Sequence, residues 1–166
     1  MRGLKILRIV PSYFPAKGGI QTFTYNIDRL LVSYGHEVDV WTTKSLSDHL
    51  PDRDLLAGVK VKRYNRQGYL KYSPKLSTAI KELKNEFDIL HFHNYHTFTA
   101  LGVISVPAGH KVVFTPHYHG RASNLFNQVL LSPYSKFLGK KIYKRSDFII
   151  CRSEFEKELR SEEHTS

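Results

Sequence analysis

The apolar positions of the chain fall into short runs that alternate with segments of helical spacing. Short apolar or alternating runs predict strands, whereas apolar residues three and four positions apart predict one face of a helix. By this pattern the sequence predicts strands at residues 4–10, 36–43, 59–64, 88–93, 111–115 and 148–151. Residues 45–57 are polar and are predicted to be irregular.

Helices are predicted between most of these strands. Apolar residues from Ile20 to Leu31 share one side of a helix that Gly35 ends. Ser73 and Pro74 suit the N-cap and the first position of the next helix. Further helical segments are predicted at 95–106, at 123–145 with a break at residue 133, and in a final acidic turn after residue 153.

Strands that alternate with helices predict an α/β fold, a Rossmann-like, doubly wound and mostly parallel sheet with helices on both faces. In the common strand order 3-2-1-4-5-6, strands one, four and five are neighbours. Their carboxyl ends then bring the Gly18–Gly19 loop, His93, Asn94 and His117 to one crevice. His91 lies lower on the same face as His93, where we expect a packed core histidine.

Gly18 and Gly19 stand between the first strand and the first helix. Glycines there let the backbone approach a ligand, and free N–H groups at a helix start favour phosphate. The pair matches neither GxGxxG nor a Walker loop, so an ordinary turn stays open as the alternative.

Composition places the chain among ordinary globular proteins. Of 166 residues, 41% are hydrophobic and 24% are charged, which excludes wholesale disorder. The single cysteine excludes an intrachain disulfide and a cysteine-based zinc site. Neither a signal peptide nor an apolar run of spanning length is recognisable, so we expect a soluble, cytoplasmic domain.

The net charge of +10 is concentrated in one region. No acidic residue lies between Asp88 and Asp147, a field that suits an anionic partner such as a nucleotide, a sugar phosphate or a lipid headgroup. A basic surface without a dedicated ligand is the alternative. No nucleic-acid motif accompanies the charge, so we expect no nucleic-acid partner.

One basic segment also carries apolar residues and suggests a membrane or anion surface. A core-facing helix with a solvated basic side stays open as the alternative. The basic residues of this segment are Lys136, Lys140, Lys141, Lys144 and Arg145.

The histidines suggest a third interpretation, a metal-dependent hydrolase with His93, His96, His117 and His119 as ligands. The acid-free region contains no carboxylate that could bind a metal or orient these rings, so we expect no metal site.

Four segments together resemble a known family. They are KILRIVPSYFPAKGGIQTFTYNIDRLLVSYGHEVDVWTT, FDILHFHNYH, KVVFTPHYHG and SDFIICRSEFEKEL. Their order and spacing resemble the amino-terminal, acceptor-side domain of retaining GT-B glycosyltransferases, the glycogen-synthase and phosphatidylinositol-mannosyltransferase-like group (subfamily 4-like). The resemblance extends to Leu159 and implies one half of a GT-B fold, in which two Rossmann-like domains face each other.

The resemblance implies roles for individual residues. Gly18 and Gly19 would approach the diphosphate of the donor, and His117 would act in catalysis, in contact with the transferred sugar. His93 and Asn94 would lie nearer the acceptor. Ser153 and Glu154 match the family's S-E pair. Tyr118 departs from the family, in which an acidic or small residue is frequent at this position.

The implied activity is transfer of a sugar from a UDP-, GDP- or ADP-sugar, with retention of configuration and without a cofactor or metal. The acceptor would be a sugar, a glycan or a lipid-linked molecule in cell-envelope or glycan biosynthesis, at the inner face of the membrane. The catalytic cations and the E-x7-E carboxylates belong to the second domain, so we expect this chain alone to be inactive. Glu154 and Glu162 have that spacing in the wrong context.

The last seven residues, RSEEHTS, do not continue the preceding pattern. They resemble a translated sequencing adapter, and an ordinary polar terminus is the alternative. We therefore expect a Rossmann-like domain at 1–159, a non-native tail at 160–166, and a carboxyl-terminal donor-binding domain that this chain lacks.

Overall fold

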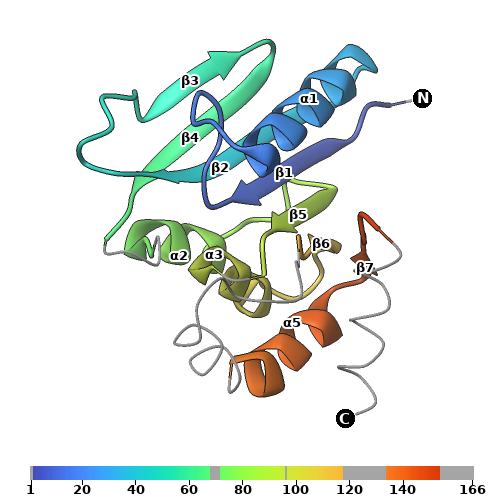
Figure 1. Cartoon of the computed structure of the whole chain (residues 1–166). Helices are drawn as coiled ribbons and strands as arrows, with labels where there is room; N and C mark the ends of the chain where they lie inside the picture. Colours follow the sequence, from blue (N-terminus) through green and yellow to red (C-terminus); the bar gives the residue numbers. More distant parts are fainter. Residues whose placement is uncertain (1, 68–71, 96, 118–133, 154–166) are drawn as a thin grey trace.

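The computed structural model describes residues 2–67, 72–95, 97–117 and 134–153, which form a seven-stranded sheet with helices on both faces (Figure 1). The strands are β1 (Lys5–Val10), β2 (Glu37–Lys44), β3 (Arg53–Leu56), β4 (Val59–Asn65), β5 (Ile89–His93), β6 (Val112–Thr115) and β7 (Phe148–Ile149). The helices are α1 (Gly19–Ser33), α2 (Pro74–Lys81), α3 (Phe98–Leu101) and α5 (Lys140–Arg145), with a 3₁₀ turn η1 (Gly102–Ser105) and a π-helical turn η2 (Tyr134–Gly139).

The strand order is β3-β4-β2-β1-β5-β6-β7, and every pair is parallel except β3–β4. Without β3, this is the predicted order 3-2-1-4-5-6, so the doubly wound prediction is confirmed. β1 lies at the centre, between β2 and β5. The carboxyl ends of β1, β5 and β6 consequently share one edge of the sheet.

The prediction that residues 45–57 are irregular is wrong for β3, which forms an antiparallel hairpin with β4. Ala57 and Gly58 both have positive φ, 50° and 84°, as a two-residue type I′ turn requires. Alanine is not the usual residue of such a turn, and the short edge strand is only half-buried, so the local pattern carries little strand signal.

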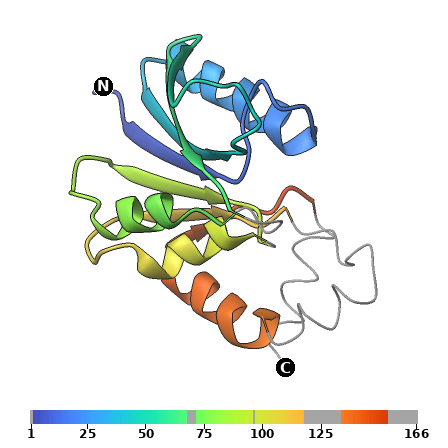
Figure 2. The same cartoon turned by 90° about the vertical axis from the view of Figure 1, so that its left-hand side faces the viewer.

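α1 covers one face of the sheet, as Figure 2 shows. Its apolar side packs on a cluster of buried residues from β1, β2 and β4. That cluster contains Val10, Val38, Val40, Val59 and Val61. Removing these side chains from water anchors α1 beside the carboxyl end of β1.

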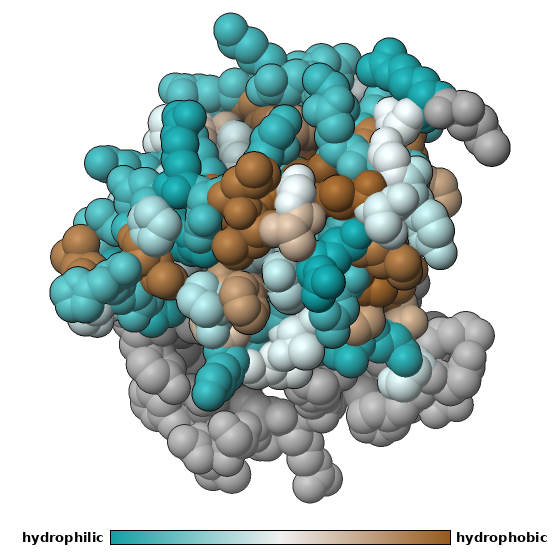
Figure 3. All heavy atoms as spheres, turned by 90° about the horizontal axis from the view of Figure 1, so that it is seen from above, coloured by the Kyte–Doolittle hydropathy of each residue, from teal (hydrophilic) through white to brown (hydrophobic). Residues whose placement is uncertain are grey.

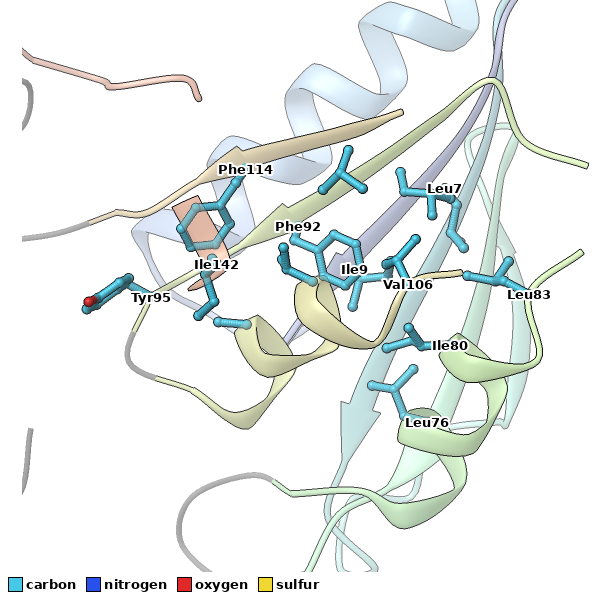
Figure 4. Close-up of a cluster of buried hydrophobic side chains, with 14 of the residues drawn as sticks. Leu7, Ile9, Leu76, Ile80, Leu83, Phe92, Tyr95, Val106, Phe114 and Ile142 are labelled. Carbon is cyan, nitrogen blue, oxygen red and sulfur yellow. The ribbon is translucent and has the colours of Figure 1, made fainter. Parts of the chain in front are cut away.

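The second, larger core lies on the other face, under α2, α3, η1 and α5 (Figure 4). Leu7 and Phe92 of the sheet meet Ile80 of α2 there. A Cβ on Gly102 would lie 2.8 Å from Cδ1 of Ile80 and 2.9 Å from Cε1 of Phe92, so a glycine lets η1 approach this core.

The predicted helix boundaries need correction in this layer. The predicted 95–106 helix is two short pieces, α3 and η1. β7 ends at Ile149, two residues earlier than predicted. Residues 123–133 and the final acidic turn lie outside the described residues.

The face of the molecule seen in Figure 3 is mainly hydrophilic, with apolar side chains gathered in a smaller area near its centre. Single exposed apolar residues such as Leu30 are ordinary on a protein surface. Within the described residues, no helix is long and apolar enough to cross a membrane.

Candidate functional site

His93 and His117 meet at the carboxyl edge of the sheet, as the strand order predicts. His93 is the last residue of β5, and His117 follows β6 by two residues. Nδ1 of His93 lies 2.8 Å from Nε2 of His117, and the rings stack with their centroids 5.1 Å apart. Both side chains are buried. The pair is therefore one unit of the site rather than two separate histidines.

The loops that carry this pair have unusual backbone geometry. Asn94 and His117 have positive φ values of 72° and 51°. Such conformations cost free energy in residues other than glycine and concentrate at functional sites. The two loops are joined because the N–H of Asn94 donates to the carbonyl of Thr115, at 3.0 Å.

A buried ion pair lies behind the histidines. Nε of Arg8 in β1 is 2.5 Å from Oδ1 of Asp28 in α1, and the Tyr13 hydroxyl donates to Oδ2 of Asp28 at 2.9 Å. Burial raises the pKa of Asp28, while Arg8 opposes that rise. Because a buried guanidinium keeps its proton and needs a counter-charge, we assign Asp28 as ionised. Burial and Asp28 raise the pKa of Tyr13, so its hydroxyl stays protonated.

Arg8 connects this ion pair to two histidines of β5. Its Nη1 lies 3.1 Å from Nδ1 of His91 and also hydrogen-bonds Nε2 of His93. Burial lowers the pKa of both histidines well below the ordinary value, and the charge of Arg8 lowers each further. Both rings are therefore neutral at neutral pH. His91, expected to be a packed core residue, is a half-buried member of this network and also contacts Oγ1 of Thr115 at 2.8 Å.

Arg152, three residues after β7, completes the described surroundings of His117. Its Nη1 lies 3.0 Å from Nδ1 of His117. The guanidinium also lies over the ring of Phe23, 4.6 Å from the ring centroid, and Phe23 meets the His117 ring edge-on. The first turns of α1 thus bring an aromatic ring to His117, and the segment after β7 brings a cation to it.

Sequence reasoning does not single out Arg8, Asp28 or Arg152. The signal that could reveal Arg8 is a charge between apolar residues in the strand that the predicted order places near the middle of the sheet. Asp28 directly follows Ile27 of the predicted apolar side of its helix. No comparable signal marks Arg152, because an arginine after a strand is commonplace.

The glycine loop enters α1 as predicted, with Gly18 as the N-cap and Gly19 as the first helical residue. Gly18 has φ 155°, and a Cβ there would lie 2.3 Å from Oε1 of Gln21. A Cβ on Gly19 would meet nothing within 4 Å. Gly19 is therefore not required by packing within the described chain, and the N-cap residue makes no side-chain hydrogen bond to the N–H groups of the helix start.

The basic segment divides into two kinds of side chain. Lys140, Lys141 and Lys144 are exposed, whereas the guanidinium of Arg145 donates to the carbonyl of Pro107 at 3.2 Å. Ile142 and Tyr143 point into the core, so α5 is a core-facing helix with a solvated basic side. The side chain of Lys136 lies outside the description.

Among the described residues, no three His, Cys, Asp or Glu side chains are grouped so that they could hold a metal ion. His96 and His119, two of the four histidines in the metal hypothesis, lie outside those residues. Nδ1 of His93 and Nε2 of His117 face each other at hydrogen-bond distance, rather than a shared position that a metal ion could occupy.

Comparison with known proteins gives one family and one related structure. The profile of Glycosyltransferase Family 4 matches residues 17–162. The sucrose-phosphate synthase of Thermosynechococcus elongatus is similar in structure, with a TM-score of 0.68 and 19% identity. The match covers 95% of this chain and 45% of that one, so the α/β domain matches half of a GT-B enzyme. No curated protein matches the chain.

Proposed function

The chain belongs to Glycosyltransferase Family 4, and on that premise we propose that it is the amino-terminal half of a transferase. The enzyme moves a hexose from a UDP-, GDP- or ADP-sugar to a sugar, glycan or lipid-linked acceptor, with retention of configuration and without a metal. In this proposal a second, donor-binding domain supplies most of the nucleotide contacts, so the amino-terminal domain alone is inactive.

The observation that carries this proposal is the buried His93–His117 pair beside the first turns of α1 and next to Arg152. Departure of a nucleoside diphosphate from a sugar places negative charge on the leaving oxygen. Fixed N–H donors and cations stabilise such charge because they need no reorganisation as it develops. His117 and Arg152 supply donors of this kind at the sheet edge where doubly wound folds bind ligands.

Gly18 and Gly19 suit the diphosphate in this proposal. α1 begins with no acidic residue in its first turn, so its N-terminal end keeps its positive partial charge. The space in front of Gly19 lets a phosphate oxygen approach the amides directly.

We place the acceptor beside Asn94 rather than His93. His93 is completely buried, and its two ring nitrogens are already engaged by Arg8 and His117. A direct contact between His93 and an acceptor would require these bonds to break. Asn94, the next residue, is only half-buried.

Titration of the purified chain with UDP-, GDP- and ADP-glucose tests the proposal by NMR. We expect weak binding of one of the three, and His117→Ala should abolish the preference for the nucleotide sugar over the free nucleotide. His36→Ala is the matched control, because His36 lies at the opposite edge, where its Nδ1 accepts from Leu4. Absence of binding by all three, or turnover by the chain alone, would contradict the proposal.

A second candidate function, binding to anionic membranes, is favoured by one observation. Phe137 is 72% exposed on the turn before α5, next to the exposed Lys140 and Lys141. An aromatic residue beside lysines suits a lipid headgroup layer. Lys140→Glu/Lys141→Glu should abolish co-sedimentation with phosphatidylglycerol vesicles, whereas the control Lys81→Glu/Lys84→Glu should not. Equal effects of the two variants would refute a specific surface.

A further inference from the structure

Within the part of the chain that the structure describes, two hydrogen-bond donors approach the ring nitrogens of His117, although a neutral ring can accept only one. Guanidinium groups only donate hydrogen bonds, and a neutral imidazole has one donor and one acceptor nitrogen. Arg8 donates to Nε2 of His93, so the proton of His93 lies on Nδ1. That N–H faces Nε2 of His117 at 2.8 Å. His117 can accept it only with its own proton on Nδ1.

Nδ1 of His117 is the atom that Arg152 approaches at 3.0 Å. A protonated Nδ1 cannot accept from a guanidinium. If the proton instead lies on Nε2, it opposes the N–H of His93. A charged ring adds a further N–H and accepts neither bond. His93 and Arg152 therefore cannot both donate to His117.

We propose that Asp28, Arg8 and His93 hold the proton of His117 on Nδ1, and that this N–H and Arg152 together bind an anionic oxygen of the ligand. The inference rests on the proposed function, in which that oxygen belongs to the donor diphosphate. An oxygen between the two donors accepts from both, which removes the conflict. Asp28, Arg8 and His93 are positioning residues, whereas His117 and Arg152 touch the ligand.

The buried ion pair fixes which group donates and which accepts in the series of hydrogen bonds from Asp28 through Arg8 and His93 to His117. Asp28 accepts from Nε of Arg8 and from Tyr13, which orients the guanidinium so that Nη1 faces both histidines. Because Arg8 never becomes an acceptor, the order of donation runs outward from the core to His117. Phe23 supports Arg152 and His117, since its ring lies under the guanidinium of Arg152 and meets the ring of His117 edge-on.

Long-range proton–nitrogen correlation spectra of the histidine rings test the tautomers in the full chain. We expect Nδ1–H on His93 and His117 but Nε2–H on His91, which then donates to Thr115. Arg8→Met should lose the His117 assignment, and Arg8→Lys, which keeps a buried donor, should restore it in part. Arg63→Met is the control, because Arg63 is equally buried but bonds to Asp54 and Phe14 instead.

Binding of inorganic pyrophosphate tests the anion site. We expect it to shift the His117 Nδ1 resonance, and Arg152→Met should weaken it by about tenfold or more, the loss of one charge-assisted hydrogen bond. Methyl glucoside, which is neutral, should not shift it.

Three results would overturn the inference: a wild-type His117 protonated on Nε2 with pyrophosphate bound, unchanged affinity in Arg152→Met, or an equal response to methyl glucoside. Where Arg8→Met does not fold, the wild-type assignments and Arg8→Lys decide. Pyrophosphate binding without nucleotide-sugar binding would keep this site and refute the proposed function alone.

Discussion

Arg8 and Asp28 join the central strand to α1 through an ion pair whose side chains are 2% and 0% exposed. Lys60 and Glu37 form a pair of the same kind at the surface, with side chains that are 62% and 58% exposed. The difference in burial decides how much each pair matters. Removal of one partner from a buried pair leaves an uncompensated charge, whereas a surface partner is simply solvated.

Arg8→Met should lower the free energy of unfolding by about 3–5 kcal/mol, because Asp28 then stays buried without a counter-charge. The control Lys60→Met should cost less than about 1 kcal/mol. Adding Asp28→Asn to Arg8→Met should recover part of the loss. Urea unfolding measures all three, and equal losses for Arg8→Met and Lys60→Met would contradict the assignment.

Tyr13→Phe should destabilise the fold by about 1–2 kcal/mol, since its hydroxyl donates to buried Asp28 and the carboxylate loses a partner. Tyr34→Phe offers the matched control, because Tyr34 is 71% exposed. Thermal unfolding of the two variants measures the difference. No loss in Tyr13→Phe would mean that water replaces the hydroxyl.

Stability should fall as the pH drops below 6.5, the ordinary pKa of histidine. Burial lowers the pKa of His91 and His93 in the folded state, so the unfolded chain binds protons there that the folded chain does not. The contribution is complete above pH 6.5 and is lost at about 1.4 kcal/mol per pH unit for each histidine on acidification.

Urea unfolding between pH 7.5 and pH 5 measures this slope, a range of about one unit or more on each side of the ordinary histidine value. His93→Gln removes one of the two groups and should flatten the dependence. A slope that is the same in His93→Gln as in the wild type would contradict this assignment to the buried histidines.

Gly102→Ala and Gly19→Ala should separate packing from ligand binding. The Cβ that Gly102→Ala introduces would press on Ile80 and Phe92, an overpacking that costs about 1–3 kcal/mol. At position 19 the space is open, so stability should change by less than about 0.5 kcal/mol. Only Gly19→Ala should weaken nucleotide-sugar binding directly, which titration at a temperature where both variants are folded would show. Equal weakening of nucleotide-sugar binding in the two variants would contradict a ligand contact at the glycine loop.

Local sequence was informative wherever a residue's environment follows from its neighbours in the chain. Alternation of apolar runs and helical spacing predicted a doubly wound fold, and the common strand order of that fold then brought His93 to His117. It was insufficient for β3, whose half-buried edge strand and Ala57 turn carry weak local signals. It also predicted one helix at 95–106, where the structure has α3 followed by the turn η1, whose Gly102 lies close to Ile80 and Phe92.

The sequence by itself determined the α/β class, the sheet order and the edge at which the candidate residues gather, because hydrophobic periodicity and the topology of parallel sheets constrain these strongly. Only the tertiary structure decided which polar groups touch. Arg8 and Asp28 come from β1 and α1, and Arg152 from the segment after β7. No local pattern records that Asp28 holds Arg8 against His93 or that Arg152 reaches His117. Hydrogen bonding between separate elements depends on differences of about a few tenths of an ångström in the donor–acceptor distance, and packing sets those distances.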